Sequence, residues 1–495
     1  MTESSRTGAA TEYTVHGDEL KRDFGFWSAF ALAFAFISPI IGLYTIFALS
    51  LSTAGPGFWW AIPLALLGQL LVAVVMAEAA SRWPLAGGVY QWSRRLIGAT
   101  YGWFAGWVYI CTLVVATATP AYVGASFLAP LVGIHKPDNT QLIALSLVIL
   151  AAATAINALN RMGLRLITIV SISAEVLGSL VIGTILLLFY RENSLSALFD
   201  GVGDSGLTMS GMLAAVAIAG WAFVGFESAG SVAEETVDAS RTAPRAIVLS
   251  LLIVGLVVMY SALALILAIP EHSLGKSADP ITDTLSAQLG SGITKPLFAI
   301  VVIGFMAGTV AGQASVSRVI FALARDELLP GHRSLTRLSR RQQLPWIAVL
   351  IVTLAAVPML LLTGTDLYVT LFSLATGGFY VAFAFPVVGM LVARLRGQRT
   401  ARSSRLGGYG LPINVAAVAW LAFEIVNIAW PRHDGAPWYQ NWSVTLMLIA
   451  IFTGGAVAYR FVRNAVRRLD QPPGTAPEYT QKPPRHPRTT EEAPK

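Results

Sequence analysis

Charged side chains are scarce in this chain. Of its 495 residues, 12% are Asp, Glu, Lys or Arg, whereas 55% are hydrophobic. A soluble globular protein carries roughly 25% charged residues, which cover its water-facing surface. A chain of this size with so few charges cannot form such a surface, and an ordinary soluble protein is therefore excluded.

Cysteine and clustered histidine are lacking as well. Cys111 is the one cysteine, which excludes an intrachain disulfide and a thiolate metal site. The six histidines fall in expected tails and loops, and the sequence contains neither a Walker loop nor a Rossmann fingerprint. We expect no metal and no bound cofactor, and we do not expect an enzyme.

Long apolar runs take up most of the chain. They are about 20 residues long, which is enough to cross a hydrocarbon core of roughly 30 Å. The predicted fold class is therefore an all-α polytopic membrane protein with about twelve transmembrane helices. These helices are predicted at residues 24–49, 57–80, 98–130, 140–160, 163–190, 210–233, 244–269, 296–318, 345–363, 367–393, 410–430 and 441–461. The third run is longer than a perpendicular span requires, so this helix must tilt or protrude.

Basic residues are distributed unevenly between these runs. If the N-terminus is cytoplasmic, nearly all Lys and Arg residues lie in cytoplasmic segments. The exceptions are Lys136, Arg191, Lys276, Lys295 and Arg432. We therefore expect a multi-pass protein of the plasma membrane with both termini in the cytoplasm. The net charge of +7 follows from this bias, so the lipid bilayer is an expected partner and nucleic acid is not.

The chain is expected to divide into four parts. Residues 1–23 form a cytoplasmic tail, residues 24–393 a core of ten helices, and residues 394–461 two additional helices. Residues 462–495, rich in Pro, Thr and charge, are predicted to be a disordered cytoplasmic tail.

Two of the predicted spans carry helix-breaking residues in mid-membrane. Transporters built from inverted repeats break one helix in each half at corresponding positions, and the breaks mark the binding site. The first and sixth spans correspond if the repeats cover about residues 24–190 and 210–393. The predicted substrate-binding residues are Ser38, Pro39, Ile40, Ile41, Gly42, Gly220, Phe223, Val224, Gly225, Phe226 and Glu227.

Glycine ladders support the same repeat. The third span carries Gly98, Gly102 and Gly106, and the eighth span carries the same four-residue spacing. Its members are Gly304, Gly308 and Gly312. The alternative interpretation is that such ladders only allow membrane helices to pack closely. For each ladder taken alone, the two interpretations are equally good.

Three segments resemble the amino acid–polyamine–organocation transporter superfamily. Residues 78–92 read EAASRWPLAGGVYQW, which is similar to a cytoplasmic loop of that family. Residues 225–247 contain GFE, AEET and RTAPRAI in the family's order, and residues 314–330 contain ASVSR and ARDELLP. The pattern looks closest to the branch of amino acid, γ-aminobutyrate and choline permeases.

The resemblance covers roughly residues 24–430 and implies a LeuT-type fold, a 5+5 inverted repeat with broken first and sixth helices plus two peripheral helices. It also implies secondary active transport by alternating access, with a small-molecule substrate between the two breaks. One departure concerns residues 38–42, which read SPIIG where many amino acid members of the family have a Gly-small-Gly turn whose free amides hold the substrate carboxylate. Because proline has no amide hydrogen, an ω-amino acid, an amine or a quaternary ammonium compound also stays in contention.

A carboxyl group in mid-membrane is the predicted ion-coupling residue. Glu175 lies near the middle of the fifth span, where an unpaired charge costs at least about 2.5–3.5 kcal/mol. Such a group favours its protonated form and can load a proton on one side and release it on the other. The alternative is a permanently protonated Glu175 bonded to a carbonyl. Glu424, in the eleventh span, is expected to be structural.

Proton coupling is preferred over sodium coupling because of Glu175. Sodium would need oxygen ligands, for which Thr309, Ser315 and Ser317 are available. Hydroxyl groups in transmembrane helices usually bond to their own backbone instead.

Glu227 and its aromatic neighbours complete the expected site. Glu227 is predicted either to act as counter-charge to a substrate amine or to cap the free amides where the helix restarts. Trp221, Phe223 and Phe226 offer faces for an ammonium group, and Phe223 is the best candidate for a gate.

Charged residues near the cytoplasmic ends are predicted to form a gate of ion pairs that open and close with alternating access. Solvated loop charges are the equally good alternative. These residues are Glu78, Arg82, Glu234, Glu235, Arg241 and Arg245.

The function that these features favour is import of an amino acid or a related small amine. Two alternatives stay open at this point. One is an exchanger driven by a counter-substrate, and the other is a nutrient receptor that binds without transport.

Overall fold

The computed structural model describes residues 20, 22–159, 161–202, 206–270, 279–339, 343–362, 367–397, 406–432 and 437–469. This part of the chain is helical, apart from loops and two isolated bridges between Phe24 and Thr236 and between Asp200 and Gly206. Most of the two expected tails lies outside the described residues.

Twelve helical segments correspond to the predicted spans. Eleven of these described segments are long and apolar enough to cross a membrane, and the ninth, α14, is a shorter apolar helix. In chain order the segments are α1 Phe26–Ile37 with α2 Pro39–Ala54, α3 Ala61–Arg82, α5 Ala99–Leu131, α6 Asn139–Leu159, α7 Arg161–Phe189, α8 Met209–Ala219 with η3 Gly220–Phe223 and α9 Ser228–Ser231, α10 Ala239–Ala268, α12 Thr294–Arg325, α14 Trp346–Leu361, α15 Leu367–Leu395, α17 Gly410–Ala429 and α19 Ser443–Leu469.

Shorter helices connect these segments. On the connections lie η1 Pro56–Trp60, α4 Gly88–Leu96, η2 Leu195–Phe199, η4 Ala233–Glu235, α11 Pro280–Leu289, η6 Ser291–Ile293, α13 His332–Leu335, η7 Gly407–Tyr409 and α18 Trp438–Asn441.

Some helices are longer than predicted. The seventh span begins at Ala239 rather than 244, because Pro244 is accommodated near the helix start instead of beginning the helix. The eighth span continues to Arg325 and α19 to Leu469, since helices with basic ends extend beyond the apolar run. Residues 462–469 of the expected disordered tail are therefore helical.

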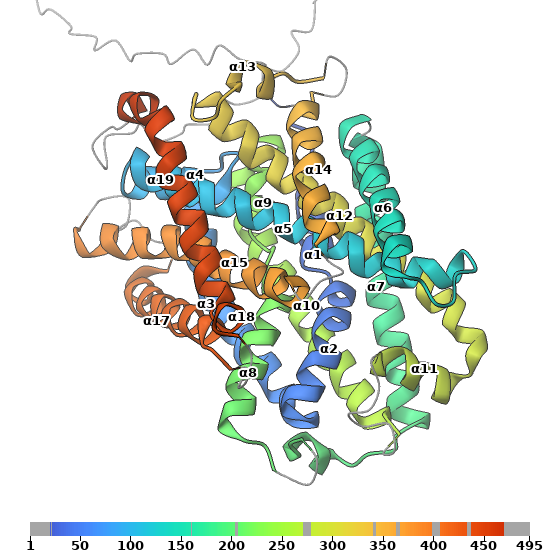
Figure 1. The fold of residues 1–495 in the computed structure, drawn as a ribbon. Helices are drawn as coiled ribbons and strands as arrows, with labels where there is room; N and C mark the ends of the chain where they lie inside the picture. The colour runs from blue at the N-terminus through green and yellow to red at the C-terminus, as the bar shows by residue number, and fades with distance from the viewer. Residues whose placement is uncertain are drawn as a thin grey trace, which may run out of the picture.

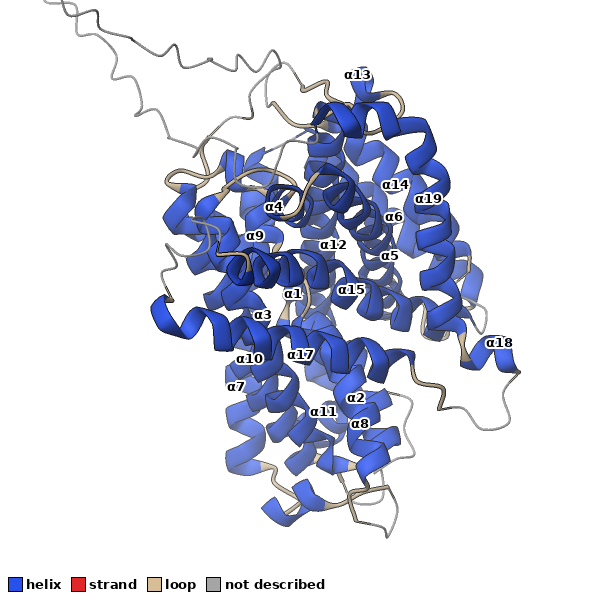
Figure 2. Cartoon of the chain, turned by 90° about the vertical axis from the view of Figure 1, so that its left-hand side faces the viewer, coloured by secondary structure: helices blue, strands red, loops and turns tan. Residues whose placement is uncertain are grey.

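The helices follow the LeuT-type inverted repeat. The first five spans are repeated by the sixth to tenth, and the long third and eighth spans, α5 and α12, have 33 and 32 residues. They pack along one another in the middle of the molecule (Figure 1). The inversion also places the short helices α4 and α11 at opposite ends of the bundle. α17 and α19 lie against the outside of α15 (Figure 2).

The two described chain ends lie on one face of the bundle. The Asp23 amide donates a hydrogen bond of 3.1 Å to the carbonyl of Glu235, and Arg468 lies 3.5 Å from Glu327. We call this face, which carries α4, α9, η4 and α13, the terminal face. An even number of crossings places both ends there, as the charge distribution predicts.

The glycines of the eighth span lie against the first span, and Gly312 also lies against Thr117 of the third. A Cβ on Gly308 would lie 2.1 Å from Cδ1 of Ile41, and one on Gly312 would lie 3.0 Å from the Phe36 ring. Gly304, Gly308 and Gly312 therefore allow α12 to pack closely against the break in the first span.

Candidate substrate and coupling site

The first span is broken at Ser38, between α1 and α2. Ser38 has φ 45° and ψ 120°, outside the helical region, and its amide still donates to the carbonyl of Phe34 at 2.7 Å. The sequence directs a restart here, because Ser is a preferred N-cap and Pro39 is favourable as the first helical residue.

The first amides of α2 already have partners. Ser38 Oγ accepts from the amide of Ile41 at 3.0 Å, and the amide of Gly42 donates to the carbonyl of Ser38 at 2.9 Å. The amide of Ile40 donates to Glu175 Oε2 at 3.4 Å. Pro39 has no amide hydrogen, and the amide of Ile40 binds Glu175. A carboxylate of the protein therefore occupies the helix N-terminus that a substrate carboxylate would otherwise use.

Glu175 lies between three spans. Its side chain is fully buried, and Oε2 accepts a hydrogen bond of 2.5 Å from Ser38 Oγ. Ser171, one turn earlier on α7, donates to Oε1. A Cβ on Gly304 of α12 would lie 3.2 Å from Oε1, so this glycine makes room for the carboxyl group. The predicted coupling residue thus contacts the break itself.

The sixth span breaks between η3 and α9. Val224 is extended, with ψ 156°, and Gly225 has φ 102°, a conformation that favours glycine. Glu227 is fully buried, and its Oε2 accepts from the amide of Gly225 at 3.1 Å while Oε1 accepts from the Tyr109 hydroxyl at 2.6 Å. The carboxyl group therefore binds an amide within the break, whereas it makes no capping hydrogen bond to α9, where the helix restarts.

The two breaks touch each other through glycines. A Cβ on Gly42 would lie 3.1 Å from Cβ of Ala222, and one on Gly225 would lie 2.9 Å from the Phe36 ring. These close approaches pack the half-helices of the two repeats against one another.

A small cavity lies between the breaks. The first span, the sixth span, α5 and α15 all contribute to its wall, and the side chains that line it are apolar or aromatic. They are Phe36, Ile37, Ile41, Ala116, Pro120, Trp221, Val224 and Phe379. The rings of Phe36 and Phe379 are 6.3 Å apart.

Only part of the predicted binding set lines this cavity. Ile41 and Val224 do, and Trp221 lines it in place of Phe223, which is fully buried behind it. Phe226 packs on Phe383 at 5.2 Å between ring centroids.

Sequence reasoning missed the cavity residues of the third and tenth spans. Pro120 within α5 was the one available signal, whereas nothing in the sequence singles out Phe379.

Known proteins with similar sequences decide the family. A family model described as amino acid permease matches residues 24–452, which is most of the chain. The chain belongs to the amino acid permease family. It is a multi-span transporter of that family and not an enzyme.

Individual relatives agree with this assignment. The amino-acid permease BAT1 of Arabidopsis thaliana is 27% identical to this permease, covering 83% of this chain and 86% of its own. The branched-chain amino acid permease BcaP of Lactococcus lactis is 26% identical over 72% of this chain and 80% of its own.

A solved structure has the same fold. The manganese transporter of Eremococcus coleocola, solved with an aromatic bis-isothiourea compound, superposes with a TM-score of 0.59 over 92% of this chain and 98% of its own, at 14% identity.

Ion pairs connect both repeats of the permease at the terminal face. Glu78 on α3 contacts Arg82 at 2.5 Å and also Arg394 on α15. Glu234 of η4 accepts two hydrogen bonds from Arg325 of α12, at 2.7 and 2.8 Å. Three of the six predicted gate residues, Glu78, Arg82 and Glu234, therefore take part in ion pairs. Glu235 is a fourth.

Glu235 forms the most deeply buried of these pairs. Its Oε1 lies 2.8 Å from Nε of Arg318, and both side chains are fully buried. Arg318, the last residue of the predicted eighth span, lies inside the bundle. Arg241, in contrast, is exposed and 3.9 Å from Asp238, and Arg245 is exposed.

A further cluster of hydrogen bonds at the terminal face was not predicted. Asp326 accepts hydrogen bonds from the Tyr90 hydroxyl at 2.5 Å, from Gln91 at 3.2 Å and from Arg94 at 2.7 Å. Burial and the neighbouring Asp326 carboxylate raise the pKa of the Tyr90 phenol, so Tyr90 stays a donor. This cluster connects α4 to the C-terminal end of α12.

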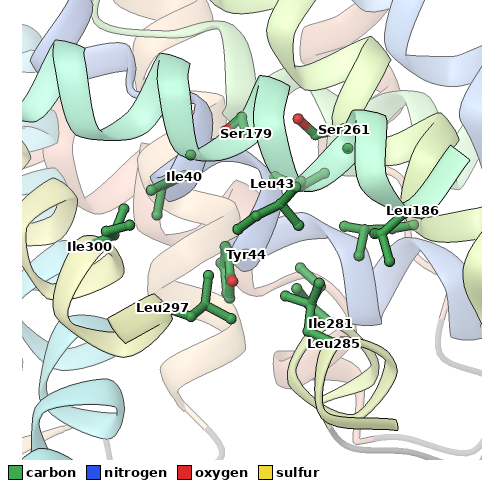
Figure 3. Close-up of a pocket in the computed structure, with 14 residues that line it drawn as sticks. Ile40, Leu43, Tyr44, Ser179, Leu186, Ser261, Ile281, Leu285, Leu297 and Ile300 are labelled. Carbon is green, nitrogen blue, oxygen red and sulfur yellow. The ribbon is translucent and has the colours of Figure 1, made fainter. Parts of the chain in front are cut away.

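A second cavity lies beside α2 (Figure 3). Leu43 and Tyr44 of α2 and Leu186 of α7 contribute to its largely apolar wall, together with residues of α10, α11 and α12. Of the predicted binding residues, Ile40 alone lines it. It is therefore separate from the space between the breaks.

The hydroxyls considered as sodium ligands are mostly engaged. Thr309 donates to the carbonyl of Phe305 and Ser317 to that of Ala314, each within its own helix. Within the described residues, no group of three or more His, Cys, Asp or Glu is arranged to hold a metal ion.

Proposed function

We propose that the permease is a secondary active transporter that imports an amino acid or a related small amine across the plasma membrane by alternating access, driven by protons. The observation that carries this proposal is the hydrogen bond between Ser38 and Glu175. It joins a buried carboxyl group to the break that forms one wall of the cavity.

Opposing effects on Glu175 suit it to proton coupling. Burial favours the neutral form, whereas the Ser38 and Ser171 hydroxyls, the Ile40 amide and the N-terminus of α2 favour the ionised form. Movement of the first-span break changes these contacts and therefore the proton occupancy. By reciprocity, proton binding changes the position of the break and the affinity for substrate.

The cavity supports a small substrate with an apolar body and an ammonium group. Its wall is apolar, and an ammonium gains about 0.5–2 kcal/mol from the face of an aromatic ring such as Trp221, Phe36 or Phe379. The first amides of α2 are occupied, which disfavours capture of an amino acid's carboxylate there.

We place the terminal face in the cytoplasm, where the positive-inside rule puts the basic residues. The pairs Glu78–Arg394, Glu234–Arg325 and Glu235–Arg318 then tie the inner ends of α3, η4, α12 and α15 together. Separation of these pairs would open the cavity toward the cytoplasm.

A ligand screen followed by transport tests the proposal. Purified protein is heated with leucine, γ-aminobutyrate, a polyamine or choline, because bound ligand raises the unfolding temperature by mass action. The stabilising compound, radiolabelled, is then offered to proteoliposomes with an imposed pH gradient.

Accumulation that follows the pH gradient supports the proposal. Uptake that ignores pH and sodium but is stimulated by substrate inside the vesicles would instead identify an exchanger. Stabilisation without measurable flux would identify a receptor.

A further inference from the structure

A group of buried polar side chains lies outside the site described above, where α17 packs against α3 and α15 (Figure 2). Gln69 of α3, Tyr380 of α15 and Glu424 of α17 are all fully buried. Tyr380 lies close to both Gln69 and Glu424. We call these three residues the α17 polar cluster.

The cluster contains polar atoms that lack partners. Among the described residues, neither Nε2 nor Oε1 of Gln69, nor the Tyr380 hydroxyl, nor Oε2 of Glu424 has a hydrogen-bond partner. Buried polar atoms are nearly always partnered by protein or by ordered water. A buried water needs about two to four polar partners, which this cluster offers at one place.

Within the part of the chain that the structure describes, no ion pair neutralises the Glu424 carboxyl group. Its Oε1 accepts a hydrogen bond of 3.2 Å from Asn427, and Arg432, the cation that acts on it, donates its own hydrogen bonds to Asn427. An unpaired carboxylate is costly inside a membrane protein. Uptake of one proton from water converts it to a neutral carboxylic acid.

Among the described residues, no second acidic side chain acts on Glu424. Arg432 on its own segment and Tyr380 on α15 are the titratable groups that act on it. α3 presents the uncharged Gln69, and α8 presents the Leu213 carbonyl, which accepts from Asn427 at 2.9 Å.

The α17 polar cluster contacts η3, the short helix that precedes the sixth-span break. A Cβ on Gly220, the first residue of η3, would lie 2.7 Å from the Tyr380 hydroxyl oxygen. The bond from Asn427 to Leu213 holds the preceding helix, α8, to α17. Gly68 packs on the Trp420 ring, so α3 and α17 are in close contact at the same level.

We propose that the α17 polar cluster is a second proton-binding site, in which Glu424 takes up a proton and a water molecule bridges it to Gln69 and Tyr380. The charge on Glu424 orients the Tyr380 hydroxyl, and this hydroxyl sets how η3 packs. The eleventh span, outside the ten-helix core, thereby acts on the sixth-span break. The structural role expected for Glu424 becomes a regulatory one.

Infrared difference spectroscopy tests the proton site without any substrate. Spectra of the full-length protein in lipid bilayers are compared between alkaline and acid pH. We expect Glu424→Gln to lose one protonated-carboxyl band, and Tyr380→Phe to retain that band at a shifted frequency. Asn414→Ala, which removes another buried polar group of α17, should leave the band unchanged. A Glu424→Gln spectrum identical to that of the parent would overturn the proposal.

Labelling of the cavity tests the link to the break. Ala116→Cys, in a Cys111→Ser and Glu175→Gln background, reports access to the cavity through its rate of reaction with a maleimide. Addition of Glu424→Gln should reduce the pH dependence of this rate. An unchanged pH dependence would overturn the link, and a dependence of the rate on sodium instead of pH would overturn the assignment of the ligand as a proton.

Discussion

Ser38 and Glu175 are 137 positions apart in the chain, yet Ser38 Oγ lies 2.5 Å from Glu175 Oε2. The contact joins the point where the first span breaks to the buried carboxyl group of the fifth. One side chain therefore caps a half-helix and at the same time donates to the proposed proton carrier. This shared use predicts that substitutions around it change both stability and pH dependence.

Ser171→Ala tests the second donor to Glu175. Loss of a hydrogen bond to a charged group costs about 1.5–3 kcal/mol, and this cost falls on the ionised form of Glu175. The pH profile of uptake should shift toward alkaline pH. Ser173→Ala is the matched control, because Ser173 is exposed on the same helix and bonds only to the carbonyl of Ile169. An equal shift in both variants would contradict the role of Ser171.

Ser38→Ala removes a cap and a donor together. Loss of an N-cap costs about 1 kcal/mol, and loss of the bond to Glu175 adds to this. Thr208→Ala serves as the control, since Thr208 caps α8 by accepting from Gly211 at 3.1 Å without contact to a buried acid. The unfolding temperature should fall further for Ser38→Ala than for Thr208→Ala. Equal losses would show that the bond to Glu175 contributes little.

Arg318→Gln removes the buried ion-pair partner of Glu235. Such a change destabilises a protein by about 3–5 kcal/mol, and the double variant Glu235→Gln/Arg318→Gln should recover part of the loss. Arg241→Gln, at an exposed pair, should change stability by less than about 0.5 kcal/mol. Thermal unfolding of the three variants and the parent measures these differences. A double variant as unstable as Arg318→Gln would contradict the pairing.

Trp221→Leu tests recognition of the ammonium group. Loss of a cation–π contact of about 0.5–2 kcal/mol weakens binding by about 2- to 30-fold. Trp346→Leu, on the exposed side of α14, is the control and should bind as the parent does. Ligand-induced shifts of the unfolding temperature measure both. Unchanged affinity in Trp221→Leu would remove this ring from the site.

Residues that interrupt a regular pattern could be interpreted from the sequence. Pro39, Gly42 and Gly225 stand out within apolar runs, and Glu175 stands out as an acid where hydrocarbon is expected. The twelve helical segments follow from the same contrast of runs and interruptions, and the structure confirms them.

Contacts between distant segments could not be predicted. Arg318 lies near a helix end like any cytoplasmic arginine, and only packing reveals that it is buried against Glu235. The partnership of Glu78 with Arg394 joins positions 316 apart. Phe379 lines the cavity because of the position of α15, and no local pattern distinguishes it from other aromatic residues in apolar helices.

Substrate accumulation by Glu175→Gln in proteoliposomes with an imposed pH gradient tests the central claim most directly. Gln keeps the size and hydrogen-bonding capacity of the side chain but cannot exchange a proton. Glu192→Gln, at an exposed glutamate, is the control. The account predicts that Glu175→Gln still binds substrate, as shown by thermal stabilisation, but no longer accumulates it in response to the gradient. Accumulation by Glu175→Gln that follows the pH gradient as strongly as in the parent would contradict the account.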